Sequence, residues 1–175
     1  ASEVVYRSLA LSKTRLKGVT YKPKLKIQTF TNWISGCCIL VKIQAIKEVG
    51  LLDNHFFAYF EDVDWSIRMK NQGYKLGVVP KSIIYHYSSG STKKNNTSNE
   101  GNLSPYAHYL NVRNHIYLIN KHALFFNSIG TRIYQILKIT FYSIYFILRC
   151  RFEKLKMVWR GMLDGIKTNN IKQIF

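Results

Sequence analysis

A long apolar and aromatic stretch near the carboxyl terminus constrains the fold most. Residues 124–148 are rich in Ile, Leu, Phe and Tyr, and residues 129–148 have about the length of a bilayer-crossing helix, at ~1.5 Å per residue. The stretch also contains Arg132 and Lys138, which are costly at the centre of a membrane. Four basic residues follow it: Arg149, Arg151, Lys154 and Lys156. The pattern favours a helix that lies in a membrane surface over one that packs against protein, and disfavours a spanning helix most.

The charge of the chain is strongly positive. Its 26 Lys and Arg residues face 9 Asp and Glu residues, which gives a net charge of +17. The excess lies in residues 1–30 and 121–175, whereas six of the nine acids lie in residues 31–120. Such a field attracts anionic lipid, phosphorylated ligands or nucleic acid. Because no RNP, KH or helix-turn-helix motif accompanies it, we do not expect nucleic acid as a partner.

The cysteines and the first residues of the chain indicate its cellular compartment and whether it is part of a longer protein. Cys37, Cys38 and Cys150 provide neither a disulfide framework nor a CxxC pair for zinc, so we expect a reducing cytosol. The first eleven residues lack the apolar core of a signal peptide. The chain does not begin with Met, and we expect it to be part of a longer protein.

Glycine and proline divide the middle of the chain into short elements. An apolar run at 39–41 predicts a buried strand, and residues 43–49 predict a short helix capped by Gly50. Acids in a first turn predict a second helix from Glu61 to Asn71. Further expected elements are strands at 75–79 and 82–87, a mobile polar loop at 88–102, and helices at 106–122 and 157–166.

Three carboxylates stand within four residues, at Glu61, Asp62 and Asp64. They repel one another, and the amides of a helix start offset only part of that cost. An ionised carboxylate there is suited to accept a proton from a hydroxyl group, and nearby aromatic rings are suited to a sugar. Taken alone, however, the acids favour an ordinary helix start, and the aromatic residues are more simply explained as part of a core.

The residues around the acids favour the catalytic interpretation. Residues 49–68 read VGLLDNHFFAYFEDVDWSIR, and Gly73-Tyr74, Pro80 and His86 follow in order. This series resembles the second half of the catalytic domain of family 2 glycosyltransferases, especially the rhamnosyltransferase-like and galactofuranosyltransferase-like members. The clear likeness covers about residues 33–92, with weaker likeness at 109–114 and 161–165.

The resemblance implies an inverting, single-displacement transfer of a hexose from a nucleotide-diphospho-sugar to a lipid-linked or saccharide acceptor, in bacterial cell-surface polysaccharide synthesis. It puts the catalytic base at Asp62 and a metal or diphosphate contact at His86. The implied acceptor-binding or base-supporting residues are Glu61, Asp64, Arg68, Trp33, Gly36, Tyr59 and Trp65. A lid over the donor is implied at Ser88, Ser89, Gly90, Ser91 and Thr92. The residues alone favour packing for His86. For Gly36 a packing role is as good an explanation as a place in the cleft, and for residues 88–92 a disordered surface loop is as good an explanation as a lid.

The family also uses a divalent cation, Mg²⁺ or Mn²⁺, which neutralises the nucleotide diphosphate as it leaves. An Asp-x-Asp motif in the nucleotide-binding half holds that ion, and no such motif precedes residue 33 here. The resemblance therefore covers the acceptor side alone. We expect the isolated chain to be inactive in transfer.

These observations predict an α/β fold in two parts. Residues 1–122 are expected to form part of a GT-A glycosyltransferase domain with a short mixed sheet, and residues 123–175 a basic, apolar helical tail. The expected location is the cytoplasmic face of the bacterial inner membrane, where basic residues hold the protein peripherally to anionic lipid. The competing hypothesis is a non-catalytic module that binds a membrane or another polyanion.

Overall fold

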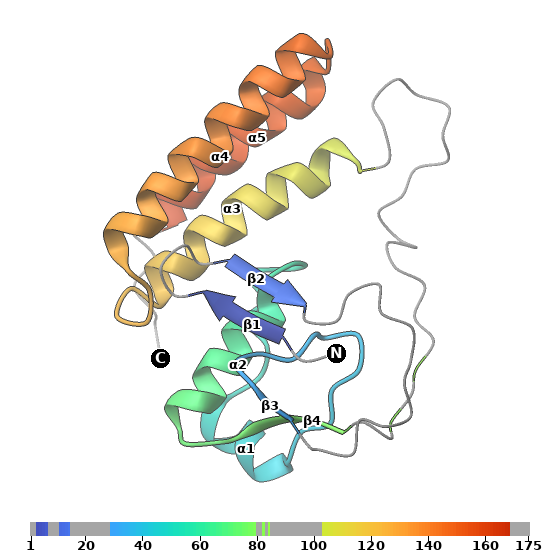
Figure 1. The fold of residues 1–175 in the computed structure, drawn as a ribbon, viewed down its shortest axis with the longest axis vertical. Helices are drawn as coiled ribbons and strands as arrows, with labels where there is room; N and C mark the ends of the chain where they lie inside the picture. The colour runs from blue at the N-terminus through green and yellow to red at the C-terminus, as the bar shows by residue number, and fades with distance from the viewer. Residues whose placement is uncertain are drawn as a thin grey trace. The chain divides into compact units, whose positions relative to one another are not determined.

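The fold comes from a computed structural model, which describes residues 3–6, 11–14, 29–79, 82, 84 and 103–168 (Figure 1). These residues are mostly helical and contain two small sheets. They divide into two compact units, the first ending at His86 and the second beginning at Tyr87. The first unit holds the strands and two short helices, and the second holds three longer helices.

The strands of the first unit form two antiparallel pairs. Strand β1 (Glu3–Tyr6) pairs with β2 (Leu11–Thr14), and β3 (Thr29–Thr31) pairs with β4 (Leu76–Val78). Phe30 of β3 stands opposite Gly77 of β4, which joins positions far apart in the sequence. Only β4 lies within a predicted strand, at 75–79. The described strands therefore give an α/β composition without identifying a GT-A sheet.

Helices α1 (Ile43–Val49) and α2 (Glu61–Asn71) have the bounds that the sequence predicts. Gly50 ends α1 with a φ of 76°, a left-handed conformation that glycine adopts without a steric penalty. On α2, Trp65 and Met69 are one turn apart and pack with Leu76 of β4. This cluster fixes α2 against the β3–β4 pair.

The strand predicted at 39–41 is wrong, because this segment has no strand partner among the residues that the structure describes. Ile39 and Val41 are half-buried against the cluster of Trp65, whereas Leu40 is fully exposed. Alternating burial in an extended segment reproduces the apolar pattern of a strand without ladder hydrogen bonds. Periodicity alone does not separate the two cases.

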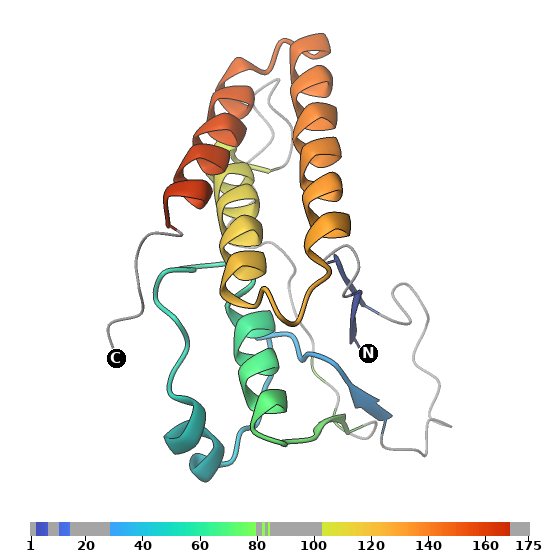
Figure 2. The same cartoon turned by 90° about the vertical axis from the view of Figure 1, so that its left-hand side faces the viewer.

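Three helices form the second unit: α3 (Pro105–Lys121), α4 (Ser128–Leu148) and α5 (Phe152–Lys167). Their starts have clear local causes. Ser104 Oγ accepts the N–H of Ala107, and Asn127 Oδ1 accepts the N–H of Gly130 at 2.7 Å. Figure 2 shows α4 and α5 joined by a tight turn and running along α3. Within the described ranges, no helix has the length and apolar character needed to cross a membrane.

Two glycines bring α5 close to α3. A Cβ added at Gly161 would lie 2.6 Å from the carbonyl oxygen of Tyr109, and one at Gly165 would lie 3.0 Å from that of Arg113. Side chains at these two positions would hold the helices apart. Helix α3 therefore packs with the tail helices in one compact unit, although the predicted boundary at residue 122 assigns it to the first domain.

Candidate active site

The segment before α2 carries unusual backbone conformations. Phe57, Tyr59 and Phe60 have φ values of 59°, 69° and 72°, in the left-handed region that bulky residues avoid. Each such residue costs on the order of 1–3 kcal/mol, and such residues concentrate at functional sites. Phe56 is fully buried and anchors the segment beneath them. These conformations determine the direction in which the backbone enters α2 at Glu61.

Two backbone amides hold the Asp62 carboxylate. Oδ2 accepts the N–H of Gly36 at 2.9 Å, and Oδ1 accepts the N–H of Val63 at 2.8 Å. Burial raises the pKa of Asp62, and hydrogen bonds from the backbone at Gly36 and Val63 lower it in part. The result is an oriented carboxylate with a pKa above its ordinary value. That combination suits a general base better than an exposed Asp does.

Gly36 contacts Asp62 through its backbone N–H, and the space around it does not require a glycine. A Cβ added there would lie 3.5 Å from Asp62 Cβ and 3.7 Å from Asp62 Oδ2, which are ordinary van der Waals distances. The structure thus brings together Gly36 and Asp62, which the sequence analysis placed in one site.

Glu61 precedes Asp62 in the chain and has one carboxylate oxygen available. Its Oε2 is buried and has no hydrogen-bond partner within the described part of the chain. Burial raises the pKa of Glu61, and the neighbouring charge of Asp62 raises it further, against a lowering by its own backbone N–H. Buried acceptors are normally satisfied, so this oxygen is suited to a hydroxyl group of a ligand.

Asp64 and Arg68 have a different environment. Asp64 is fully buried, and its Oδ2 accepts the Nε–H of Arg68 at 2.9 Å, the pairing expected from their four-residue spacing. The Arg68 guanidinium also donates to the backbone oxygens of Val49 and Leu51. These contacts tie α2 to the end of α1. The geometry favours a supporting role for both residues and not contact with an acceptor.

The predicted aromatic residues differ in exposure. Trp65 is 8% exposed, packs into the cluster with Met69 and Leu76, and donates its indole N–H to Gly50 O at 2.9 Å. Trp33 is also buried, and Tyr59 is half-buried. A buried ring offers no face to a sugar, so the geometry of Trp65 favours packing. Phe57, at 76% exposed, is the outward-facing ring of this segment.

Three hydrogen bonds join α2 to the segment after β3, and the sequence analysis predicted none of them. Gly36 bonds to Asp62, Ile34 N–H donates to Ser66 Oγ at 3.2 Å, and Lys70 Nζ donates to Asn32 Oδ1 at 2.7 Å. The helix residues are spaced by four and the segment residues by two, so the two run antiparallel in a fixed register. We call these bonds the α2 ladder. Its signal in the sequence is the polar series 62, 66 and 70 on a largely buried helix.

The described residues do not form a cation site. No three of their His, Cys, Asp and Glu side chains come together in a way that suits a metal ion. The spacing Asp62-x-Asp64 is not a metal pair either, because Asp64 is buried on Arg68. His86 and the lid residues 88–92 lie outside the described residues, so their roles stay predictions.

Comparison with known proteins shows that about half of this chain is similar to enzymes that transfer a sugar. N-acetylglucosaminyl-diphospho-decaprenol L-rhamnosyltransferase of Mycobacterium tuberculosis is 32% identical over 91 residues, which are 52% of this chain and 27% of that protein. Half of this chain is similar to a rhamnosyltransferase. Rhamnosyltransferase WbbL of Escherichia coli is 28% identical over 85 residues, which are 49% of this chain and 31% of that protein. No protein-family profile and no solved structure matches.

Both relatives are named as rhamnosyltransferases, so the matched half of this chain is similar to part of a glycosyltransferase. The chain matches only 27–31% of their length, so the activity of the whole protein is a matter for proposal. The GT-A fold, membership of family 2 and the predicted roles of the site residues stay predictions.

Proposed function

We propose that the chain carries the acceptor side of a glycosyltransferase active site, with Asp62 as the general base. The observation that carries the proposal is the half-buried Asp62 carboxylate held by the amides of Gly36 and Val63. The similarity to two rhamnosyltransferases supports the reaction class.

In the proposed reaction, an acceptor hydroxyl attacks the anomeric carbon of a nucleotide-diphospho-sugar. A glycosidic C–O bond forms, the bond to the nucleotide diphosphate breaks, and the hydroxyl proton passes to a carboxylate oxygen of Asp62. Each oxygen accepts one amide and retains a lone pair for the proton. The raised pKa of Asp62 strengthens it as a proton acceptor in the transition state.

Glu61 orients the acceptor in this proposal. Its buried Oε2 accepts a second hydroxyl of the acceptor sugar, which satisfies an oxygen that otherwise lacks a partner among the described residues. Phe57 offers an exposed ring beside the same helix start. The α2 ladder and the Asp64–Arg68 pair hold these groups in place.

The proposed donor is an activated hexose, and the proposed acceptor is lipid-linked or a saccharide. One relative is named for a lipid-linked diphosphate acceptor, and both relatives are named for rhamnose transfer. The matches cover only 27–31% of the relatives' length, and we propose that donor binding, with an Asp-x-Asp motif for Mg²⁺ or Mn²⁺, belongs to the part of such an enzyme that they do not cover. A bound cation would neutralise the leaving diphosphate, and His86 would be the contribution of this chain to that region. The isolated chain is then inactive in transfer.

The test is Asp62→Asn in the full-length parent protein. We expect kcat to fall by roughly 10²–10⁴-fold, the usual contribution of a general base, while the affinity for donor is unchanged. Glu48→Gln is the matched control, because Glu48 is an exposed carboxylate whose hydrogen-bond partners, Gln44 and Tyr74, have no role in the proposed site. Normal turnover by the Asp62→Asn protein would refute the assignment of the base.

A non-catalytic module that binds a membrane or polyanion is the alternative. The helical unit and the net charge of +17 favour it. It gives no role to the oriented Asp62 or to the buried oxygen of Glu61. Absence of transfer by the full-length parent with any nucleotide-sugar, together with tight vesicle binding, would favour the alternative.

A further inference from the structure

The outer face of α4 is apolar along the whole helix. Its large side chains are all more than half exposed: Ile129, Ile133, Ile136, Leu137, Phe141, Ile144, Ile147 and Leu148. At 3.6 residues per turn they occupy an arc of about 140°, and the other residues of the helix on that arc are Gly130 and Thr140. Arg132 and Lys138 lie on either side of it. We call this surface the α4 face.

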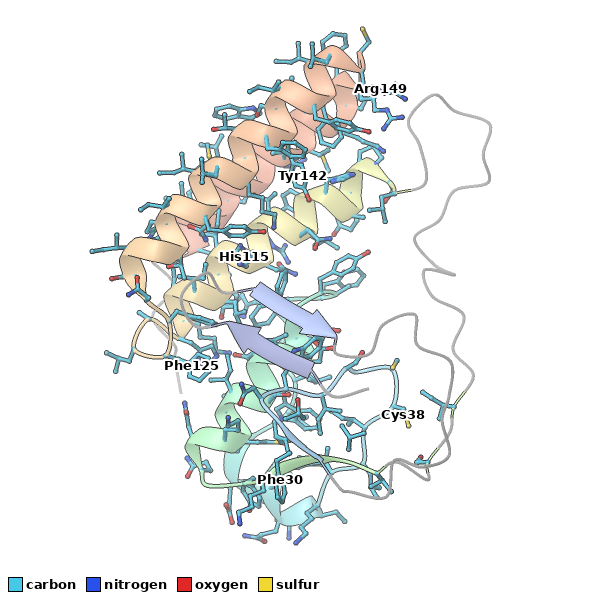
Figure 3. All side chains as sticks on the ribbon, viewed as in Figure 1. Phe30, Cys38, His115, Phe125, Tyr142 and Arg149 are labelled. Atoms are coloured by element: carbon cyan, nitrogen blue, oxygen red, sulfur yellow. The ribbon has the colours of Figure 1, made fainter. Side chains whose placement is uncertain are left out.

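The α4 face turns away from α3. The inner side of α4 carries Tyr142 and Phe146, whose rings meet His108 of α3 edge-on at 5.6 and 5.0 Å between centroids. Figure 3 shows Tyr142 between α4 and α3, with a row of other side chains along α4 pointing outward. The described residues of this unit therefore leave the α4 face uncovered.

Helix α5 carries a matching strip with a basic border. Its exposed apolar residues are Phe152, Trp159, Leu163 and Ile166, and the next strip around the helix holds Lys156, Arg160 and Lys167. The opposite side of α5 is the side of Gly161 and Gly165, which lies against α3. Both apolar strips are thus on the sides of α4 and α5 that face away from α3, and one surface is able to touch both.

The chemistry of the α4 face and of the apolar strip on α5 indicates what kind of partner covers them. An apolar strip with Trp, bordered by Lys and Arg, is the pattern of a helix that lies in a membrane interface. A second copy of the chain would bring another net charge of +17 to the same face, whereas an anionic bilayer brings the opposite charge. Exposed apolar surface of this extent is unusual for a soluble monomer.

We propose that α4 and α5 lie in the surface of an anionic bilayer, with the α4 face and the Trp159 strip among the acyl chains nearest the headgroups. Lys156, Arg160 and Lys167 then lie beside the lipid phosphates. The proposal rests on the helical unit alone and does not depend on catalysis by Asp62.

The test is co-sedimentation of the purified chain with vesicles. One set consists of phosphatidylcholine, and the other of equal parts phosphatidylcholine and phosphatidylglycerol. We expect binding to the anionic set, weaker binding to the neutral set, and loss of the difference at high salt. Trp159 should move into an apolar environment, so a blue shift of Trp emission on binding should disappear in Trp159→Phe while sedimentation remains.

Two pairs of variants locate the contact. Leu137→Asn with Phe141→Asn should weaken binding roughly tenfold or more, because two large apolar groups no longer leave water. The control is Leu40→Asn with Leu51→Asn, at positions in the other unit that are more exposed than Leu137 and Phe141, and this variant should bind normally. Lys156→Gln with Lys167→Gln should weaken binding about thirtyfold, and Lys42→Gln with Lys47→Gln, which removes the same charge elsewhere, should not.

Several outcomes would overturn the proposal. These are no binding of the folded chain to anionic vesicles, equal losses in the test and control pairs, or binding that does not respond to lipid charge. Concentration-dependent self-association without lipid, abolished by the Leu137 and Phe141 substitutions, would instead identify a second copy as the occupant. Circular dichroism of each variant checks that its helices are retained. None of these readouts involves sugar transfer, so they leave the proposed function untouched.

Discussion

The backbone N–H of Gly36 lies 2.9 Å from Oδ2 of Asp62, although 26 positions separate the two residues in the sequence. The α2 ladder explains how this contact is kept. Ser66 and Lys70, one and two turns further along α2, bond to Ile34 and Asn32. Each bond fixes the register of the others, so the position of the proposed base depends on residues that do not touch the substrate.

Ser66→Ala should therefore impair catalysis from a distance. It leaves the Ile34 N–H without its acceptor, which should cost about 1–3 kcal/mol of folding free energy. In the full-length parent, kcat should fall several-fold while the KM for donor stays constant, because the base is displaced and donor contacts are not. Ser66→Thr, which keeps the hydroxyl, should restore part of the activity.

Ser143→Ala is the matched control for this change. The Ser143 hydroxyl donates to Ile139 O within α4, in a half-buried position of the other unit. Its loss should leave kcat unchanged. Urea titration shows that both variants are folded under the assay conditions. An equal fall in kcat for both variants would then assign the effect to stability and not to the position of Asp62.

The pH dependence of the unfolding free energy should reveal the cost of burying the charged Glu61 carboxylate. The pKa of Glu61 is raised in the folded chain, so the folded state favours its protonated form and loses stability as pH rises through that pKa. Glu61→Gln removes this loss and should make the chain more stable than wild type at pH 7. The advantage should vanish below the ordinary pKa of a carboxyl group, about 4. Urea unfolding across this range measures it.

Glu48→Gln should show the opposite sign. Hydrogen bonds from Gln44 and Tyr74 lower the pKa of Glu48, so its charged form contributes stability above its ordinary pKa and loses it as the pH falls. Glu48→Gln should therefore be less stable than wild type at pH 7, and equal to it in acid. A Glu61→Gln chain that is less stable than wild type at pH 7 would contradict the assignment of a buried, unsatisfied carboxylate.

The Asp64–Arg68 pair should carry most of the electrostatic stability of the first unit. Arg68→Met leaves the fully buried Asp64 without its cation, which should cost roughly 3–5 kcal/mol in unfolding free energy. Arg160→Met is the matched control, since Arg160 and Asp164 have the same four-residue spacing on an exposed part of α5. That change should cost less than about 1 kcal/mol. Similar costs in the two variants would show that Asp64 is solvated.

The sequence allowed local structure to be predicted better than contacts between distant segments. Gly50 and the acids from Glu61 define the ends of α1 and α2, and these signals depend on neighbouring residues alone. Strands β1, β2 and β3 lie in a basic, weakly patterned region, where pairing partners rather than periodicity determine the strands. The i,i+4 spacing identified the Asp64–Arg68 pair, yet it did not show that Asp64 is buried while Asp62 accepts the N–H of Gly36. The register of the α2 ladder depends on folded geometry that no sequence period records.

Gly161 should be intolerant of even the smallest side chain. In an isolated helix, Gly to Ala is favourable by about 1 kcal/mol. Here the new Cβ would lie 2.6 Å from the Tyr109 carbonyl, so α5 must move away from α3. We expect Gly161→Ala to lower the unfolding free energy by about 1–3 kcal/mol, as overpacking does. Gly36→Ala, whose Cβ meets Asp62 at 3.5 Å, should change it by less than about 1 kcal/mol. A Gly161→Ala chain as stable as wild type would mean that α3 and α5 are further apart than the structure places them.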